Sequence, residues 1–118
     1  MQIKHALFIL SLNRDNLFRA HYANCQDFSD YEKIIKKQML FIKNKNILSE
    51  TYKRFYNSLS ENNKKYFKAV YIKKRKLSIT ELSKSLGLYP EKLFKKIKYF
   101  ETKFNEILNT VNEEFNEN

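Results

Sequence analysis

The chain has almost none of the residues that end helices and form tight turns. Its 118 residues include one glycine and one proline, Gly87 and Pro90, which stand close together. Sheet proteins with many short strands need such residues at most turns, so this scarcity argues against a β fold. Apolar residues instead recur at helical spacing along most of the sequence. The chain is therefore predicted to be all-α, a helical bundle of about six helices.

The residues around Gly87 and Pro90 have the pattern of two helices joined by a tight turn. Ser78 and Glu81 form an S-x-x-E capping box at the start of the first helix. Gly87 ends that helix because glycine adopts a left-handed backbone conformation without strain, and Pro90 suits the first turn of the next helix. One side of the second helix is apolar, with Leu93, Ile97 and Phe100. This pattern is typical of a helix-turn-helix, whose second helix enters the major groove of DNA.

Residues 59–104 resemble a known DNA-binding region. They combine a Leu-Ser opening, a helix of the KKYFKAVYI type, the run SITELSKSLG and the run LFKKIK. The stretch is similar to region 4 of sigma-70-type factors and to the small sigma-like phage and bacterial regulators built on that region. Nothing before Leu59 resembles the promoter-melting region of a full sigma factor. The resemblance therefore implies a transcriptional regulator rather than a complete sigma factor.

Positive charge is concentrated in the same part of the chain. The net charge is +10. Residues 64–98 hold twelve basic and two acidic residues, whereas residues 99–118 hold one basic and five acidic residues. A basic patch of this kind attracts phosphate backbones and releases their counterions. The charge distribution therefore favours a nucleic-acid partner.

The residues expected to bind DNA lie on and beside the second helix. Its groove-facing and basic positions are Tyr89, Glu91, Lys92, Lys95, Lys96 and Lys98. Lysine can donate to guanine and glutamate can accept from cytosine at the base edges. The residues expected to hold phosphates are Lys64, Lys65, Lys73, Lys74, Arg75, Lys76 and Lys84. Any single one of these lysines is better explained as solvated surface, so the hypothesis depends on the cluster.

The N-terminal part, residues 1–46, is interpreted as a helical interaction or dimerisation segment. One or two helices are expected in its first half, with a restart at Asn13, and a further helix is expected to begin at a cap formed by Ser29. The polar run KNKN at residues 43–46 is interpreted as a linker. It would separate this segment from a DNA-binding domain over residues 47–118.

The second domain is expected to open with two helices capped by Ser49 and Ser60. The helix that begins at Pro90 has no stop signal after Phe100. Its apolar residues continue at spacings of four and three, through Phe104, Ile107 and Val111. Two interpretations stay open: a coiled-coil dimer seam, or packing against the N-terminal helices. The acidic end, residues 112–118, is expected to fray.

No catalytic, metal or cofactor motif is recognisable. One glycine excludes a glycine-rich phosphate loop, and the single Cys25 excludes an internal disulfide and a multi-cysteine metal site. His5 and His21 have no partner at metal-ligand spacing. The longest purely apolar run, residues 6–10, is far too short to span a membrane. A cytoplasmic protein without enzymatic activity or cofactor is expected.

The leading hypothesis is a sequence-specific DNA-binding transcriptional regulator whose partner is double-stranded DNA. A second hypothesis is a protein-interaction module on a helix-turn-helix-like scaffold, which binds RNA polymerase or inhibits a partner. Structured RNA is a third, because lysine patches do not distinguish nucleic acids. Both a monomer and a homodimer are compatible with the sequence.

Overall fold

The described chain consists of helices and the turns that join them. The computed structural model describes residues 1–73 and 77–117. Within these residues there are six α-helices, α1 (Ile3–Ser11), α2 (Arg14–Ala23), α3 (Phe28–Ser58), α4 (Glu61–Phe67), α5 (Ile79–Ser85) and α6 (Pro90–Asn116). A π-helical turn, η1 (Lys68–Ile72), continues α4, and no strand occurs in the described residues. The all-α prediction is confirmed.

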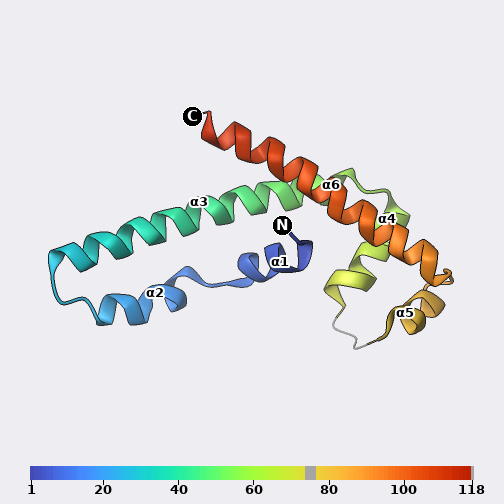
Figure 1. Ribbon diagram of the computed structural model, residues 1–118, viewed down its shortest axis with the longest axis horizontal. Helices are drawn as coiled ribbons and strands as arrows, with labels where there is room; N and C mark the ends of the chain where they lie inside the picture. The colour runs from blue at the N-terminus through green and yellow to red at the C-terminus, as the bar shows by residue number, and fades with distance from the viewer. Residues whose placement is uncertain (74–76, 118) are drawn as a thin grey trace.

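The molecule is elongated, with α3 running along most of its length (Figure 1). Its principal extents are 59 × 34 × 19 Å, and its radius of gyration of 18.2 Å exceeds the value of about 13.5 Å expected for a compact domain of this length. The chain runs out through α1 and α2, turns back into α3, and ends in α6, which crosses α3. We call residues 14–42, which comprise α2 and the first half of α3, the arm. We call the remaining helical part the body.

An aromatic core holds the body together. Phe55 of α3, Phe67 of α4, and Phe100 and Phe104 of α6 have no exposed surface. The ring of Phe55 lies 5.3 Å from that of Phe67 and 5.6 Å from that of Phe104, both edge to face. Such geometry aligns the positive ring edge with the negative ring face. Ile3 and Ala6 of α1 and Leu48 and Leu59 close the cluster. Elements far apart in sequence therefore share one core.

The linker predicted at residues 43–46 is wrong, because these residues lie inside α3. Neither Lys nor Asn breaks a helix, so their polarity marks solvent exposure and not an interruption. Lys45 instead donates through Nζ to the carbonyl oxygen of Leu12 at the end of α1, 2.7 Å away. The cap predicted at Ser49 is also wrong, since α3 continues through it to Ser58. The division into two domains stays a prediction.

The start of α3 also differs from the prediction. The N-cap is Asp27, whose Oδ1 accepts from the backbone N–H of Asp30 at 2.8 Å, and Ser29 lies in the first turn. Aspartate is at least as good an N-cap as serine, and the earlier position adds helical residues. The predicted helix restart at Asn13 and the predicted cap at Ser60 are confirmed, and the two side chains accept from backbone N–H groups at 3.1 and 3.2 Å.

The turn between α5 and α6 has the predicted geometry. Ser78 Oγ accepts from the backbone N–H of Glu81 at 3.2 Å. Gly87 has φ +70°, and the N–H groups of Gly87 and Leu88 donate to the carbonyls of Lys84 and Ser83 at 3.2 and 2.9 Å. This pair of bonds is the Schellman motif, which pairs carbonyls that a helix end leaves open. Pro90 occupies the first turn of α6. A short helix, a glycine turn and a long helix are therefore present as predicted.

The long C-terminal helix uses its apolar stripe inside the molecule. Leu93, Phe100, Phe104 and Val111 are fully buried, and Ile107 and Leu108 pack against the core formed with α1 and α3. The interpretation of this stripe as a dimer seam is therefore wrong, because the chain's own helices already cover the residues that would form it. The acidic end is helical beyond Val111, since α6 continues to Asn116, and Asn118 lies outside the described residues.

Candidate nucleic-acid interface

The outer side of α6 carries exposed charged residues above a buried apolar side. Glu91, Lys92, Lys95 and Lys98 are exposed, and Tyr89, just before the helix, is 82 % exposed. Leu93 and Phe100 on the opposite side anchor the helix in the body. The first three turns of α6 therefore present basic side chains on a rigid support, with no part of the described chain covering them.

Lys96 differs from the other lysines of α6 because it is half-buried. Its Nζ donates to Asn63 Oδ1 of α4 at 3.1 Å and lies 4.6 Å from the centroid of the Tyr66 ring. A cation over an aromatic face is attracted by the ring quadrupole. The sequence pattern placed Lys96 at the base edges, whereas the structure makes it a bridge between α4 and α6.

A shallow hollow of about 340 Å³ forms where α4 meets α6. Its lining contains three lysines, one amide and one phenol: Asn63, Lys92, Lys95, Lys96 and Tyr99. Two of these residues, Asn63 and Tyr99, were not in the predicted site. No sequence motif marks them, because they join the site only through the packing of α4 on α6. The hollow has the size and charge to hold a phosphate group of a nucleic-acid backbone.

A second basic hollow, of about 250 Å³, lies on the outer side of α4. It is lined by Tyr56, Glu61, Lys64, Lys65, Lys68 and Lys73. Lys64 Nζ lies 3.3 Å from Glu61 Oε1 and 5.3 Å from the Tyr56 ring centroid. A hydrogen bond with Tyr56 raises the pKa of Lys68 above its usual value. Lys68 was missing from the predicted site, although it lies one helical turn beyond Lys64 and Lys65 on the same side.

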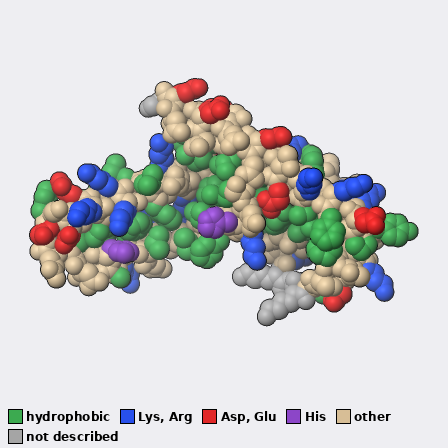
Figure 2. Space-filling view, viewed as in Figure 1, with side chains coloured by type: hydrophobic (Ala, Val, Ile, Leu, Met, Phe, Trp, Pro, Cys, Tyr) green, Lys and Arg blue, Asp and Glu red, His purple; other side chains and the backbone are tan. Residues whose placement is uncertain are grey.

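The remaining predicted phosphate contacts fall into two groups. Lys84 is exposed in the last turn of α5. Lys74, Arg75 and Lys76 lie outside the described residues, so their predicted contacts stay predictions. In Figure 2, Lys and Arg side chains gather over the α4–α6 end of the molecule, and others lie over the arm at the opposite end. Basic side chains therefore lie at both ends of this face and are not confined to the candidate site.

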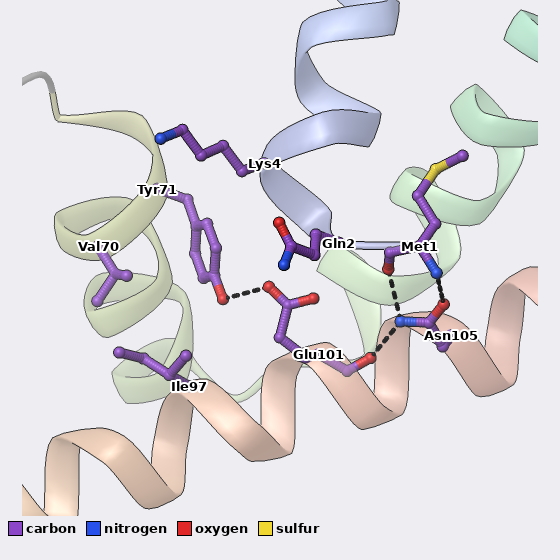
Figure 3. A pocket seen from close by; sticks show the side chains of 8 residues that line it. All are labelled: Met1, Gln2, Lys4, Val70, Tyr71, Ile97, Glu101 and Asn105. Carbon is purple, nitrogen blue, oxygen red and sulfur yellow. Dashed lines mark hydrogen bonds between the residues drawn. The ribbon is translucent and has the colours of Figure 1, made fainter.

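A separate hollow of about 680 Å³ lies between α1, η1 and α6 (Figure 3). At its base, Glu101 accepts through Oε1 from the Tyr71 hydroxyl at 2.8 Å and through Oε2 from the backbone N–H of Ile3 at 3.0 Å. Burial raises the pKa of Tyr71, and the hydrogen bond between its hydroxyl and Glu101 raises it further. Asn105 Nδ2 donates to the carbonyl oxygen of Met1 at 2.7 Å. Because both oxygens of Glu101 are engaged in holding helices together, we assign this cluster a structural role.

Other site classes have little support in the described part of the chain. No group of three His, Cys, Asp or Glu side chains lies close enough to hold a metal ion there. None of its helices combines the length and the apolar character needed to cross a bilayer. Comparison of the chain with protein-family models, curated proteins and solved structures gave no match. The resemblance to sigma-70 region 4 stays a prediction from the sequence.

Proposed function

We propose that the protein is a cytoplasmic, sequence-specific DNA-binding regulator of transcription without enzymatic activity. Its helix-turn-helix comprises α5 and α6, and the outer side of α6 enters the major groove. Lys92, Lys95 and Lys98 reach base edges and the adjacent phosphates, and Glu91 accepts from cytosine. The lysines of α4 and η1 hold backbone phosphates on either side.

One observation supports this proposal more than any other. The first turns of α6 bury Leu93 and Phe100 completely while leaving Glu91, Lys95 and Lys98 exposed. A recognition helix needs this division, because its inner side must fix its position and its outer side must be free for the groove. If packing within the chain had covered the lysines, DNA could not reach them.

The test measures DNA affinity by fluorescence anisotropy as a function of salt, on sites selected from a random-sequence duplex pool. The triple variant Lys92→Ala/Lys95→Ala/Lys98→Ala should bind at least tenfold more weakly. The slope of log K against log salt should fall by about one unit for each phosphate contact removed. The matched control is Lys33→Ala/Lys36→Ala/Lys37→Ala, which removes the same charge from exposed positions of the arm.

The control separates position from net charge. If both triple variants lose affinity equally, binding is non-specific attraction to a basic protein, and the helix-turn-helix proposal is wrong. A double-stranded RNA of the selected sequence gives a further comparison. Equal affinity for RNA would contradict sequence-specific DNA binding. It would indicate RNA binding that depends on shape, because side chains cannot read the narrow major groove of A-form RNA.

A second candidate function, a protein-interaction module that binds RNA polymerase or another protein, is favoured by the arm. Phe28 is 74 % exposed, Met39 65 % and Leu40 59 %. Met39 and Leu40 are neighbours in α3, and large apolar side chains exposed next to one another mark interaction surfaces more often than single ones do. If RNA polymerase binds wild-type protein but not a variant with these three residues changed to serine, the second function is supported.

A further inference from the structure

A partly exposed apolar stripe of α3 adjoins the side that α2 covers in the arm. Phe28, Ile35, Met39 and Ile42 follow one another at steps of seven, four and three residues, which an α-helix places on one side. Phe28 and Met39 are mostly exposed, and Ile35 and Ile42 are half-buried. The stripe extends for about 21 Å along the helix axis. We call these four residues the arm stripe.

The inner contacts of the arm lie on the adjoining side of α3, next to Ile35 and Ile42. Phe18 of α2 meets Phe41 with 5.9 Å between ring centroids, and Tyr22 packs against Tyr31 at 5.6 Å. The Tyr22 hydroxyl also donates to Gln38 Oε1. α2 therefore covers the side that contains Tyr31, Gln38 and Phe41. In the space-filling view the arm shows apolar side chains at its surface, with Lys or Arg side chains between them (Figure 2).

Three exposed charged residues, Glu32, Lys36 and Lys43, lie on one edge of the arm stripe, and Lys43 Nζ also donates to Asn116 Oδ1 of α6 at 3.0 Å. Glu32 and Lys43 are both exposed and are separated by eleven residues, or three helical turns. If a second α3 lies antiparallel across the stripe, Glu32 of each copy reaches Lys43 of the other. The same register places Met39 of each copy beside Ile35 of the other. A two-fold axis repeats both contacts, as an isologous interface requires.

We propose that the protein forms a homodimer through the arm stripe, with the two α3 helices antiparallel. This pairing covers the most exposed apolar side chains of the arm and forms the Glu32–Lys43 pair twice. It also holds the two bodies at opposite ends of the assembly, because the arm projects away from the body (Figure 1). The proposal does not depend on DNA binding, and its test uses no nucleic acid.

The expected dimer is concentration-dependent. A contact between two helices over about 21 Å buries less than the roughly 1,600 Å² of a standard interface, so an affinity in the micromolar range is expected. Sedimentation equilibrium of the full chain from ~1 μM to ~1 mM should therefore show a change from monomer to dimer. A monomer throughout this range would overturn the proposal. It would leave the exposed stripe to a partner of another kind.

The decisive variants are a matched pair on neighbouring residues. Met39→Glu places a charge in the stripe and should weaken dimerisation at least tenfold. Leu40→Glu introduces the same charge at a residue of similar exposure that lies about 100° further round the helix, and should leave dimerisation unchanged. Both side chains are mostly exposed, so neither variant should unfold the monomer. If both variants weaken the dimer equally, or neither does, the stripe is not the interface.

The register is tested by exchanging the flanking charges. Glu32→Lys and Lys43→Glu should each weaken dimerisation severalfold, because each creates like charges across the interface. The double variant Glu32→Lys/Lys43→Glu restores opposite charges and should recover most of the lost affinity. Failure of the double variant to recover would overturn the antiparallel register. A recovery that disappears in high salt would support it, because exposed pairs are screened.

Discussion

The body and the arm are both built from helices with an apolar side, but they differ in how many neighbouring helices pack against that side. In the body, α1, α3, α4 and α6 surround Phe55, Phe67 and Phe100, and all three rings are fully buried. In the arm, where every residue is described, α2 lies against one side of α3 and Phe18 alone is buried. Apolar side chains at helical spacing therefore produce a core only where a further helix covers them.

Because of this difference, the body should be the more stable region, and it also contains the candidate DNA-binding residues. Buried contacts hold α6 in place and so fix the candidate DNA-binding side chains in the body. The arm has few buried contacts, so it should open locally with a smaller free energy than the body. Equivalent substitutions in the two regions should therefore differ in their cost.

The largest expected effect is the loss of a core phenylalanine. Phe100→Ala should lower the free energy of unfolding by about 3–5 kcal/mol, because it removes buried apolar surface and leaves a cavity. Met39→Ala in the arm should change it by less than about 0.5 kcal/mol, because its side chain is mostly exposed. Urea unfolding followed by circular dichroism measures both. Similar losses for the two variants would remove the distinction between body and arm.

Gly87→Ala tests the turn that positions α6. Gly87 has φ +70°, and no atom lies within 4 Å of the position that a Cβ would occupy, so the expected penalty is backbone strain alone. It should be about 1–2 kcal/mol. Gly87→Asn should lose less, because asparagine tolerates this conformation better. Thermal unfolding measures both, and a wild-type-like Ala variant would contradict the assigned left-handed turn.

A third prediction tests whether Asp27 or Ser29 caps the N-terminus of α3. Asp27→Ala should cost the arm about 1 kcal/mol, because Asp27 Oδ1 caps the N–H of Asp30, while Ser29→Ala should cost little. Amide hydrogen exchange measured by NMR should show faster exchange in the first turns of α3 for Asp27→Ala only. Faster exchange in Ser29→Ala instead would show that Ser29 is the cap, as the sequence predicted.

The smallest expected effect concerns the ion pair between α3 and α6. Arg54 donates through Nη2 to Glu114 Oε2 at 2.7 Å, and this hydrogen bond lowers the pKa of Glu114. A lowered folded-state pKa stabilises the fold above the unfolded-state pKa, and this contribution disappears as pH falls through the folded-state pKa. Arg54→Met should therefore reduce stability slightly at neutral pH and not at all in strong acid.

A pH series of urea midpoints measures this effect. The control is Arg19→Met on the exposed surface of α2, which should show no such dependence on pH. A difference between wild type and Arg54→Met that grows in acid would contradict the assigned direction, and so would an equal pH dependence in both variants.

Local signals predicted the turn and two of the four caps, those at Ser60 and Ser78. Ser60, Ser78, Gly87 and Pro90 act through bonds to residues within about one helical turn, so the sequence beside them contains the relevant information. The errors arose where two local signals competed or where polarity was taken for a break. Asp27 and Ser29 are both good caps, and the KNKN run resembles a linker only because its side chains are polar.

The candidate site was predictable only in part, because a sequence pattern reveals the sides of one helix but not the contacts between helices. The exposed lysines of α6 could be named from the helical pattern of one segment. Lys96 could not be separated from them, because its contacts with Asn63 and Tyr66 join residues about thirty positions apart. The hollow between α4 and α6 and the role of Tyr99 in it depend on the same packing.

Composition and short-range pattern alone determined that this chain is helical, that a tight turn lies at Gly87, and that positive charge is concentrated over residues 64–98. These properties depend on backbone geometry and on charges that neighbouring residues share. The tertiary structure decided that the stripe of α6 lies in the core and that the stripe of α3 stays open. Identical spacing can produce either result, because burial depends on which other helices pack against a surface.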